Sequence, residues 1–328
     1  MVKPSFLLMI PLLGISGLSA CPSEDDCPAC VADFAIYDPD WEDDGVWEEE
    51  VTALQTFLTT YGYDFERVSD ADVESGLLAG SDGLHFRALI APGGYAWPRE
   101  VALSAAGETN IRAFVNRGGG FLSFCAGSFW AAEQVVWAEE ATGGGGAYNA
   151  GDDYASYDYH LDLFPGAAQG PFGWTPWAGG TGASLQEVKL DTSLPTLAAL
   201  GLPSTSRFFY YGGPFFTAGA FPPDLEVWAR AVAPEGLSGD ARTGAGEPSV
   251  VSYPYGEGRV VLFSYHPEIL IHDDADGVTL TQAIDETTMN WDTGGMSWED
   301  ISYQSWSIVY GAVQVVTGQE VKPLPFVP

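Results

Sequence analysis

Basic side chains are scarce in this sequence. Lysine and arginine together number 12, against 45 aspartate and glutamate residues, and the formal net charge is −33. Such a charge repels phosphate backbones and anionic lipid surfaces, so we expect no nucleic-acid partner. The acidic residues could instead form a binding face, but a heavily hydrated surface suited to a salty or extracellular setting is the favoured interpretation.

Long apolar runs are also lacking near the N-terminus. The apolar stretch 6–13 is too short to span a membrane, and Pro4, Pro11 and Gly14 interrupt the segment around it. A single lysine before this stretch and small residues after it are typical of a secretion signal. Any membrane attachment is therefore expected to come from a lipid anchor.

The small residues end in the sequence "LSAC" at Cys21. This tetrapeptide resembles the lipobox of bacterial lipoproteins, in which the cysteine is lipidated and becomes the new N-terminus. We therefore expect residues 1–20 to be a lipoprotein signal peptide and Cys21 to be the lipidation site. The protein would then be exported and lipid-anchored in the cell envelope, in the periplasm or at the cell surface. An ordinary cleaved signal peptide is the alternative.

Cysteine is rare: the chain has four. Cys27 and Cys30 lie in "CPAC", within an acidic leader and with no strand before it, whereas a redox C-x-x-C caps a helix after a strand. A local disulfide in an exported tether, residues 21–32, is the favoured interpretation. A metal site would need two more ligands nearby, and the surrounding sequence offers none, so we expect no metal.

From residue 33 onward, strand and helix patterns alternate. Apolar residues spaced by three and four between positions 47 and 61 predict one face of a helix. Further patterns predict a helix over 110–120 and strands over 33–37, 63–69, 87–94 and 121–124. The alternation predicts an α/β domain over residues 33–320, with a mainly parallel sheet and helices on both faces, followed by a tail over 321–328.

The second half of the sequence is less regular. Two segments rich in Gly, Tyr and Trp, 141–160 and 169–182, are interpreted as ordered loops or strand edges around the sheet. Apolar runs then predict strands over 225–232, 248–256 and 258–268, and a closing helix over 297–319.

The stretch "GGGFLSFCAGSFWAA", residues 118–132, places Cys125 between a predicted strand and a possible helix. This is the pattern of a nucleophile elbow, a sharp turn that lifts one side chain above the sheet, with small neighbours such as Ala126 and Gly127. The positive end of the helix would favour a thiolate there. The alternative is a buried structural cysteine.

A second motif, "SYHPEI", places His266 and Glu268 at the end of an apolar strand. A thiolate needs an imidazole as its proton partner, and the imidazole needs a carboxylate to fix its tautomer. Cys125, His266 and Glu268 can supply these three roles, and ligands collect at the carboxyl ends of parallel strands, where all three are expected.

Together the segments 91–98, 118–132, 209–216 and 256–269 resemble the class I glutamine amidotransferase-like superfamily. Within it they are most similar to the N-terminal domain of biotin-protein ligases, which also occurs as a stand-alone bacterial protein. The resemblance covers roughly residues 33–270. It implies a flavodoxin-like fold with Cys125 as nucleophile, His266 as base and Glu268 as its orienting carboxylate. It also implies an oxyanion hole from backbone amides near Gly93, Gly94 and Ala126.

The same resemblance makes a set of aromatic and glycine residues candidates for substrate binding. They are Tyr95, Trp97, Tyr210, Tyr211, Gly212 and Gly213. Superfamily amidotransferases usually carry a glutamine shortly after the elbow cysteine, whereas Ser128 and two aromatic residues follow Gly127 here, which argues against glutamine hydrolysis. The glycine- and arginine-rich signature of the ligase catalytic domain is also missing, so biotin transfer is not implied.

These observations predict a thiol-dependent hydrolase or transferase that acts on an amide or acyl bond and needs no cofactor. Its substrate would be a small molecule or a peptide. A protein that keeps the pocket and binds such a ligand without chemistry is the alternative, since a fold does not by itself establish an activity.

Overall fold

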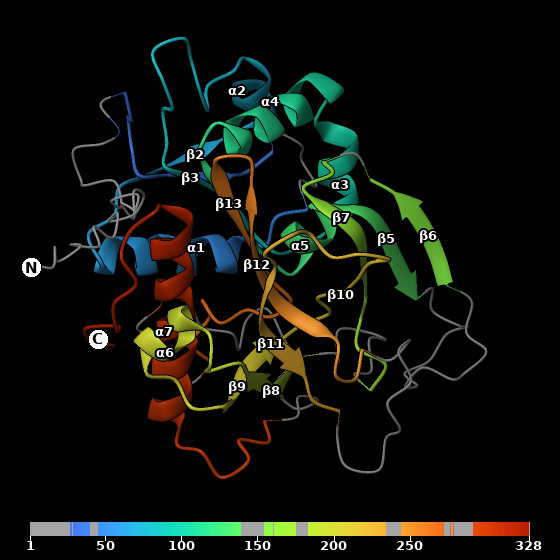
Figure 1. Cartoon of the computed structure of the whole chain (residues 1–328), viewed down its shortest axis with the longest axis vertical. Helices are drawn as coiled ribbons and strands as arrows, with labels where there is room; N and C mark the ends of the chain where they lie inside the picture. The colour runs from blue at the N-terminus through green and yellow to red at the C-terminus, as the bar shows by residue number, and fades with distance from the viewer. Residues whose placement is uncertain are drawn as a thin grey trace, which may run out of the picture.

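Four strands predicted in the first part of the chain, together with the one predicted over 258–268, form one half of a large sheet. In the computed structural model they are parallel to one another, in the spatial order β2-β1-β3-β4-β13 (Figure 1). Their bounds are Phe34–Tyr37 (β1), Phe65–Val68 (β2), Ala88–Ala91 (β3), Gly120–Phe124 (β4) and Gly258–Phe263 (β13). Most are short apolar runs, as expected of parallel strands that are covered on both faces.

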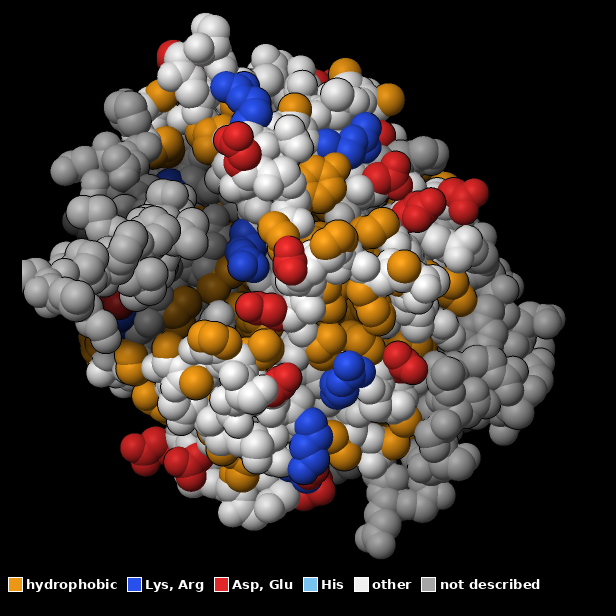
Figure 2. Space-filling view, in the orientation of Figure 1, with side chains coloured by type: hydrophobic (Ala, Val, Ile, Leu, Met, Phe, Trp, Pro, Cys, Tyr) orange, Lys and Arg blue, Asp and Glu red, His pale blue; other side chains and the backbone are white. Residues whose placement is uncertain are grey.

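The structure describes most of the chain beyond the predicted signal peptide, and Figure 2 colours the side chains of these residues by type. The described residues are 27, 29–39, 45–138, 154–159, 161–174, 183–233, 244–271, 276, 278 and 291–327. The predicted signal peptide and Cys21 lie outside them. Within these residues, no helix combines the length and the apolar character needed to cross a membrane.

The other half of the same sheet is antiparallel. It continues from β13 through β12 (Pro248–Tyr255), β11 (Glu226–Ala231), β8 (Ser184–Leu190) and β9 (Thr205–Tyr210), to give nine strands. The sheet is therefore mixed, where the sequence predicted a mainly parallel one. The reason is the tight turn after β12: Tyr255 pairs with Gly258, and so short a turn can join only antiparallel strands.

A second sheet of four strands lies beside the first, on the right in Figure 1. It has the order β10-β7-β5-β6, formed by Phe215–Thr217 (β10), Phe164–Gly170 (β7), Ala132–Ala138 (β5) and Tyr154–Asp158 (β6). Strand β6 falls in the segment 141–160, which the sequence suggested was a loop or strand edge, and β7 lies almost entirely between the two segments of that kind, where no element was predicted. Because β5 starts immediately after the helix that follows Cys125, this sheet stands next to the candidate site.

Helices cover both faces of the main sheet, as predicted. One apolar cluster joins one face to α1 (Glu48–Thr60), α6 (Pro195–Leu200) and α7 (Trp298–Val316). A second cluster joins the other face to α2 (Asp70–Glu74), α4 (Ala105–Asn116) and α5 (Ala126–Trp130), and α3 (Ala96–Ala102) contacts α5. Along β1, Phe34 and Ile36 belong to the first cluster and Ala35 and Tyr37 to the second, because alternate side chains of a strand point to opposite faces.

Several helix ends follow from local sequence. The Ser104 hydroxyl accepts a hydrogen bond from Gly107 N at the start of α4, and Ser297 does the same for Asp300 N at the start of α7. Helix α6 ends at Gly201, whose φ of 69° is the left-handed conformation that favours glycine. These caps place the helix ends without help from distant contacts.

The predicted tether and tail both contact the domain. Cys27 and Cys30 form a disulfide, and Val31 N donates a hydrogen bond to His85 O at 2.8 Å. In the predicted tail, Leu324 is buried and Lys322 N donates to Gln314 Oε1 at 2.9 Å. The described ends of these two segments therefore pack on the domain.

Candidate active site

Cys125 occupies a sharp turn between β4 and α5. Its backbone has φ 43° and ψ −106°, and its amide donates to Phe263 O on the neighbouring β13 at 2.9 Å. A positive φ is rare for a residue with a side chain and costs on the order of 1–3 kcal/mol, so the surrounding contacts must hold it. The thiol is free of any disulfide and is only 5% exposed.

The residues after Cys125 hold this turn in place. A Cβ at Gly127 would lie 2.2 Å from Ala91 O, so only glycine lets α5 pack this closely on β3. Ser128 is fully buried; its hydroxyl donates to Phe263 O at 2.8 Å and lies 2.8 Å from the Ser123 hydroxyl. The hydroxyl of Ser128 is therefore used inside the fold and does not line the pocket described below.

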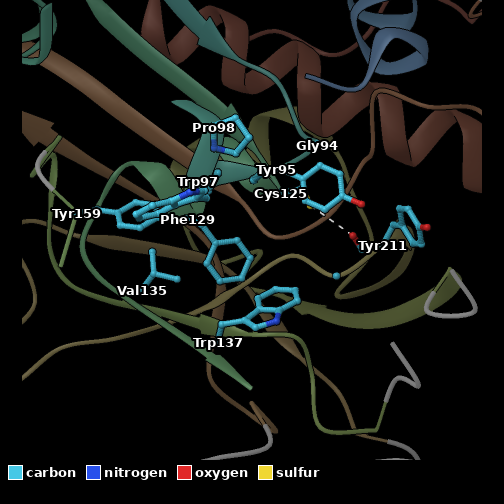
Figure 3. A pocket seen from close by; sticks show the side chains of 13 residues that line it. Gly94, Tyr95, Trp97, Pro98, Cys125, Phe129, Val135, Trp137, Tyr159 and Tyr211 are labelled. Atoms are coloured by element: carbon cyan, nitrogen blue, oxygen red, sulfur yellow. Dashed lines mark hydrogen bonds between the residues drawn. The ribbon is translucent and has the colours of Figure 1, made fainter. Parts of the chain in front are cut away.

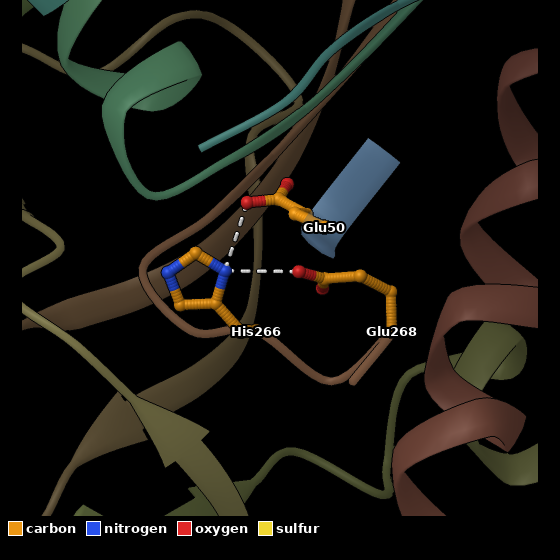
Figure 4. Close-up of side chains that lie close together, drawn as sticks. All are labelled: Glu50, His266 and Glu268. Atoms are coloured by element: carbon orange, nitrogen blue, oxygen red, sulfur yellow. Dashed lines mark hydrogen bonds and ion pairs between the residues drawn. The ribbon is translucent and has the colours of Figure 1, made fainter. Parts of the chain in front are cut away.

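His266 follows β13 at the same end of the sheet. Its Nδ1 lies 2.9 Å from Glu268 Oε1 and 3.1 Å from Glu50 Oε2, and all three side chains are buried (Figure 4). The His266 amide donates to Phe209 O at 2.8 Å, and its ring meets the Trp47 ring edge-on at 5.2 Å. His266 Nε2 is buried and has no hydrogen-bond partner among the described residues. Nδ1 of the ring therefore faces the two carboxyl groups, and Nε2 is left to transfer a proton.

Glu50 is the functional candidate that sequence reasoning missed. It lies in the first turn of α1 among three consecutive glutamates, where acidic residues are common because they suit the positive end of a helix. The available signal is its spacing: Leu54 and Phe57 follow four and seven positions later, and all three are buried. A carboxylate on the apolar face of a helix is unusual and points to a partner.

Gly93 packs against Glu50, His266 and Cys125. A Cβ at this position would lie 2.2 Å from Glu50 Oε2, 2.5 Å from His266 Cε1 and 3.3 Å from Cys125 Cβ. Its carbonyl accepts hydrogen bonds from Trp47 N at 3.2 Å and Arg99 Nη2 at 2.6 Å. The three side chains therefore share one tightly packed space that the turn after β3 leaves open.

We expect Gly93→Ala to destabilise the protein by about 1–3 kcal/mol, because the added methyl group overpacks a buried cluster. Thermal unfolding measures the effect as a lower Tm. Gly219→Ala is the matched control, because nothing lies within 4 Å of a Cβ built at Gly219. Equal Tm values for the two variants would show that the cluster can relax without cost.

Electrostatic interactions among Cys125, Glu50, His266 and Glu268, together with burial, favour the protonated forms of His266 and Glu268. Burial opposes a charge on His266, but the Cys125 thiol, Glu50 and Glu268 together raise the pKa of the imidazole well above its usual range. Burial, and then the neighbouring charge of Glu50, raise the pKa of Glu268 from 4.5 to about 8. An imidazolium beside two carboxyl groups, one of which keeps a proton near neutral pH, follows from this arrangement.

The same three residues have the composition of a metal-binding set. One ligand atom from each of Glu50, His266 and Glu268 lies within 4.8 Å of the others, and in the described part of the chain this is the one such group of three. Carboxylates with imidazole suit divalent transition metals. However, Glu268 Oε1 lies at the 2.9 Å of a direct hydrogen bond to His266 Nδ1, and Glu50 Oε2 lies 3.1 Å from the same nitrogen as an ion pair.

A pocket of about 580 Å³ opens in front of Cys125 (Figure 3). Cys125 and Ala126 line it, with the turn from Gly94 to Pro98 and Tyr211–Gly212 as further walls. Phe129, Val135, Trp137 and Tyr159 complete the lining. The Cys125 thiol donates to Tyr211 O at 3.4 Å. This volume is typical of small-molecule sites.

The predicted oxyanion-hole residues lie in two different places. Gly94 and Ala126 line the pocket beside Cys125. Gly93 lies behind them, buried against Glu50 and His266, and is not among the residues that line the pocket. Gly94 and Ala126 are therefore the better candidates for donors to a developing oxyanion, and Gly93 provides space for the cluster.

The family model for the biotin-protein ligase N-terminal domain matches residues 48–292. The chain belongs to this family. The matched range contains Glu50, Cys125, His266 and Glu268 as well as every described residue that lines the pocket. No match was found among curated proteins.

This member of the biotin-protein ligase N-terminal family also has similar solved structures. A ThuA-like protein from Parabacteroides merdae is 13% identical, with a TM-score of 0.45 over 90% of this chain and 93% of that one. A ThuA-like protein from Bacteroides uniformis is 16% identical, with a TM-score of 0.41 over 79% and 91%. The β-galactosidase from Bacillus circulans sp. alkalophilus is 15% identical, with a TM-score of 0.38 over 77% and 30%.

Two predicted substrate-binding residues lie in the core of this family member instead of the pocket. The Tyr210 hydroxyl accepts from Phe172 N and donates to Gly213 O, both at 2.8 Å, and its ring stacks on Phe172. A Cβ at Gly213 would lie 1.9 Å from Ser264 O. Tyr210 and Tyr211 are neighbours at the end of a strand and project to opposite sides, so only Tyr211 faces the pocket.

Proposed function

We propose that this protein is a thiol-dependent hydrolase or transferase that acts on an amide or acyl bond. Its domain would have the flavodoxin-like, class I glutamine amidotransferase-like fold. The parallel strands support this fold, because their order β2-β1-β3-β4-β13 matches the 2-1-3-4-5 order of flavodoxin-like sheets. Cys125 and His266 follow the ends of two of these strands, where ligands bind in such sheets.

The observation that carries the proposal is the environment of Cys125. A cysteine held at a positive φ faces a pocket and lies beside a buried imidazole whose Nδ1 is close to two carboxyl groups. A cysteine that only filled space would not need a strained backbone or an imidazole partner. Strain of this kind gathers at functional sites, where it aims a side chain.

The residues can be assigned to steps of an acyl transfer. Transfer of the Cys125 proton to His266 gives a thiolate–imidazolium pair, and the thiolate attacks the carbonyl carbon to form a tetrahedral intermediate. Backbone amides at Gly94 and Ala126 stabilise the oxyanion. The bond to the leaving group then breaks as His266 returns the proton, which leaves an acylated Cys125. Water or another nucleophile releases the acyl group with His266 as general base.

Glu50 and Glu268 would both position His266. Each has an oxygen within hydrogen-bond reach of Nδ1, so either one can orient the ring and stabilise the imidazolium. This arrangement extends the predicted set of Cys125, His266 and Glu268 by one carboxylate. It also means that loss of one carboxylate leaves the other in place.

Covalent trapping tests the proposal. An activated acyl electrophile, such as a β-lactone, should add to Cys125 in the folded protein, and intact-mass analysis with peptide mapping should find one adduct at that residue. Cys125→Ser should show no thioester adduct under the same conditions. If the native protein gains no adduct while denatured protein does, the enzyme proposal is wrong.

A second candidate function is ligand binding without chemistry. The exposed rings of Tyr95 and Trp97 at the mouth of the pocket favour it, because exposed large apolar side chains often mark binding sites. Under this alternative, a ligand would bind Cys125→Ala as tightly as the wild type. Glutamine hydrolysis is not proposed, because Ser128 and two aromatic residues stand where amidotransferases usually carry a glutamine. Biotin transfer is not proposed, because the signature of the ligase catalytic domain is missing.

We further propose export as a lipoprotein, on the basis of the "LSAC" sequence that ends at Cys21. In a bacterial host, mass spectrometry of the mature protein should then find a diacylglyceryl group on Cys21 and no residues from 1–20. Cys21→Ala should release the protein from the membrane fraction. An unmodified N-terminus at another residue would contradict the proposal.

A further inference from the structure

The lining of the pocket restricts what can bind in front of Cys125. Six of its 13 described residues are aromatic, and the others are glycine, alanine, proline, valine and cysteine. None carries a charged, amide or aliphatic hydroxyl side chain. Glu50 and Glu268 lie behind His266 and are not among the residues of the lining. A ligand in this pocket therefore meets apolar surface and aromatic rings.

No basic side chain among the described residues lines this pocket. Arg99 lies in α3, directly after the pocket residues Gly94 to Pro98. Its side chain is fully buried, however, and its guanidinium donates to Pro92 O and Gly93 O. Of the 12 lysine and arginine residues, only Lys3 and Arg242 lie outside the described residues. An anionic ligand would thus lose its hydration without gaining a lysine or arginine partner from the described lining, on a protein whose net charge is already −33.

The aromatic walls are largely preformed. Phe129 and Trp137 meet edge to face at 5.4 Å, and Tyr211 contacts the Trp47 ring at 5.8 Å. Trp97 and Tyr95 stand at the mouth, 56% and 68% exposed. Figure 3 shows Trp97, Phe129 and Trp137 on walls of the same space near Cys125. Such walls favour a flat apolar ring, because stacked or edge-to-face aromatic pairs are stabilised beyond the burial of apolar area.

We propose that the acyl donor of this site is a small, uncharged compound whose acyl group carries an aryl ring, held between Trp97 and the Phe129–Trp137 wall. This inference rests on the proposed thiol chemistry and adds the substrate class. A sugar ring fits less well, because the described lining offers its hydroxyl groups only phenol and indole groups and no carboxylate, amide or basic side chain. A macromolecular acyl donor could enter only through such a ring at its end.

The reaction can be written for a thioester donor. The Cys125 thiolate attacks the carbonyl carbon and forms a new C–S bond, and the C–S bond to the departing thiol breaks. The departing sulfur takes its proton from His266 Nε2. With a phenylacetyl thioester as donor, the product is phenylacetyl-Cys125, which gives a defined mass increase without any oxidant or cofactor.

The test compares matched thioesters of one thiol, N-acetylcysteamine: phenylacetyl, 4-carboxyphenylacetyl, cyclohexylacetyl and acetyl. The initial rate of Cys125 acylation is followed by intact-mass spectrometry. We expect the phenylacetyl donor to react at least about tenfold faster than the carboxylate-bearing donor and faster than the cyclohexyl and acetyl donors. Trp97→Ala should reduce the preference for phenylacetyl over acetyl, whereas Tyr303→Ala, an exposed aromatic on α7, should not change it.

The outcomes separate this inference from the proposed function. Acylation of Cys125 at equal rates by all donors, or fastest by the carboxylate donor, would overturn the aryl inference and leave the thiol chemistry supported. Unchanged selectivity in Trp97→Ala would also overturn it. Failure of every donor to acylate Cys125 would reject the proposed function, and the inference with it.

Discussion

His266→Ala slows the alkylation of Cys125 by iodoacetamide at neutral pH by at least about tenfold, because the thiolate loses its cationic partner. The imidazole lies beside the thiol, and Glu50 and Glu268 favour its charged form. The rate is measured on folded protein, with mapping of the modified peptide.

Two variants make this result specific to the site. Glu268→Gln should have a smaller effect, because Glu50 still lies 3.1 Å from His266 Nδ1. His85→Ala is the matched histidine control, since His85 bonds to Leu77 O and Asp82, far from Cys125 in the fold, and should leave the rate unchanged. If Cys125 is labelled only after unfolding, in the wild type and in every variant, Cys125 has only a packing role and the binding alternative is preferred.

The free energy of unfolding falls as the pH rises from about 4.5 to about 8, and Glu268→Gln removes much of this fall. Glu268 has a pKa of about 8 in the folded protein and about 4.5 when exposed to water, so the folded state holds the extra proton across this range. A state that binds more protons loses stability as the pH rises, by about 1.4 kcal/mol for each pKa unit. The raised pKa of His266 acts in the same direction.

Urea unfolding at several pH values tests this expectation. The stability of Glu268→Gln relative to the wild type should increase between pH 5 and pH 8.5, because the variant has no carboxylate to ionise at that position. Glu66→Gln, at an exposed position of β2, controls for the removal of one negative charge from a protein of net charge −33. Parallel pH profiles for the two variants would show that the buried carboxyl pair does not hold the extra proton.

The extent to which the fold could be predicted differs between the two halves of the chain. Strands β1, β3 and β4 are short apolar runs followed by turns or helices, a pattern that buried parallel strands share. Strand β7, with the sequence "FPGAAQG", has neither an apolar run nor clear alternation. It forms a strand because β5 and β10 pair with it on its two sides. Such pairing with distant segments leaves little trace in a local window.

The candidate site shows the same difference. Cys125, His266 and Glu268 stand at strand ends, and the structure brings them together at one end of the sheet. Glu50 was missed because a glutamate in the first turn of a helix is ordinarily a favourable surface residue. Tyr210 was assigned to the pocket together with Tyr211 because both lie in the segment that carries the family resemblance, although their side chains leave the strand on opposite sides.

Features that depend on neighbouring residues follow from the chain's local pattern: the elbow at Cys125, which needs small residues after it, and the exit of His266 and Glu268 from an apolar strand. The contact of Glu50 with His266 Nδ1, and the pocket that Phe129, Trp137 and Trp97 line together, come from the packing of the folded domain. These contacts join α1 to the loop after β13, and α5 to β5 and α3. Such contacts depend on how elements distant in the sequence pack on the sheet, and packing is set by the shape of all the partners together.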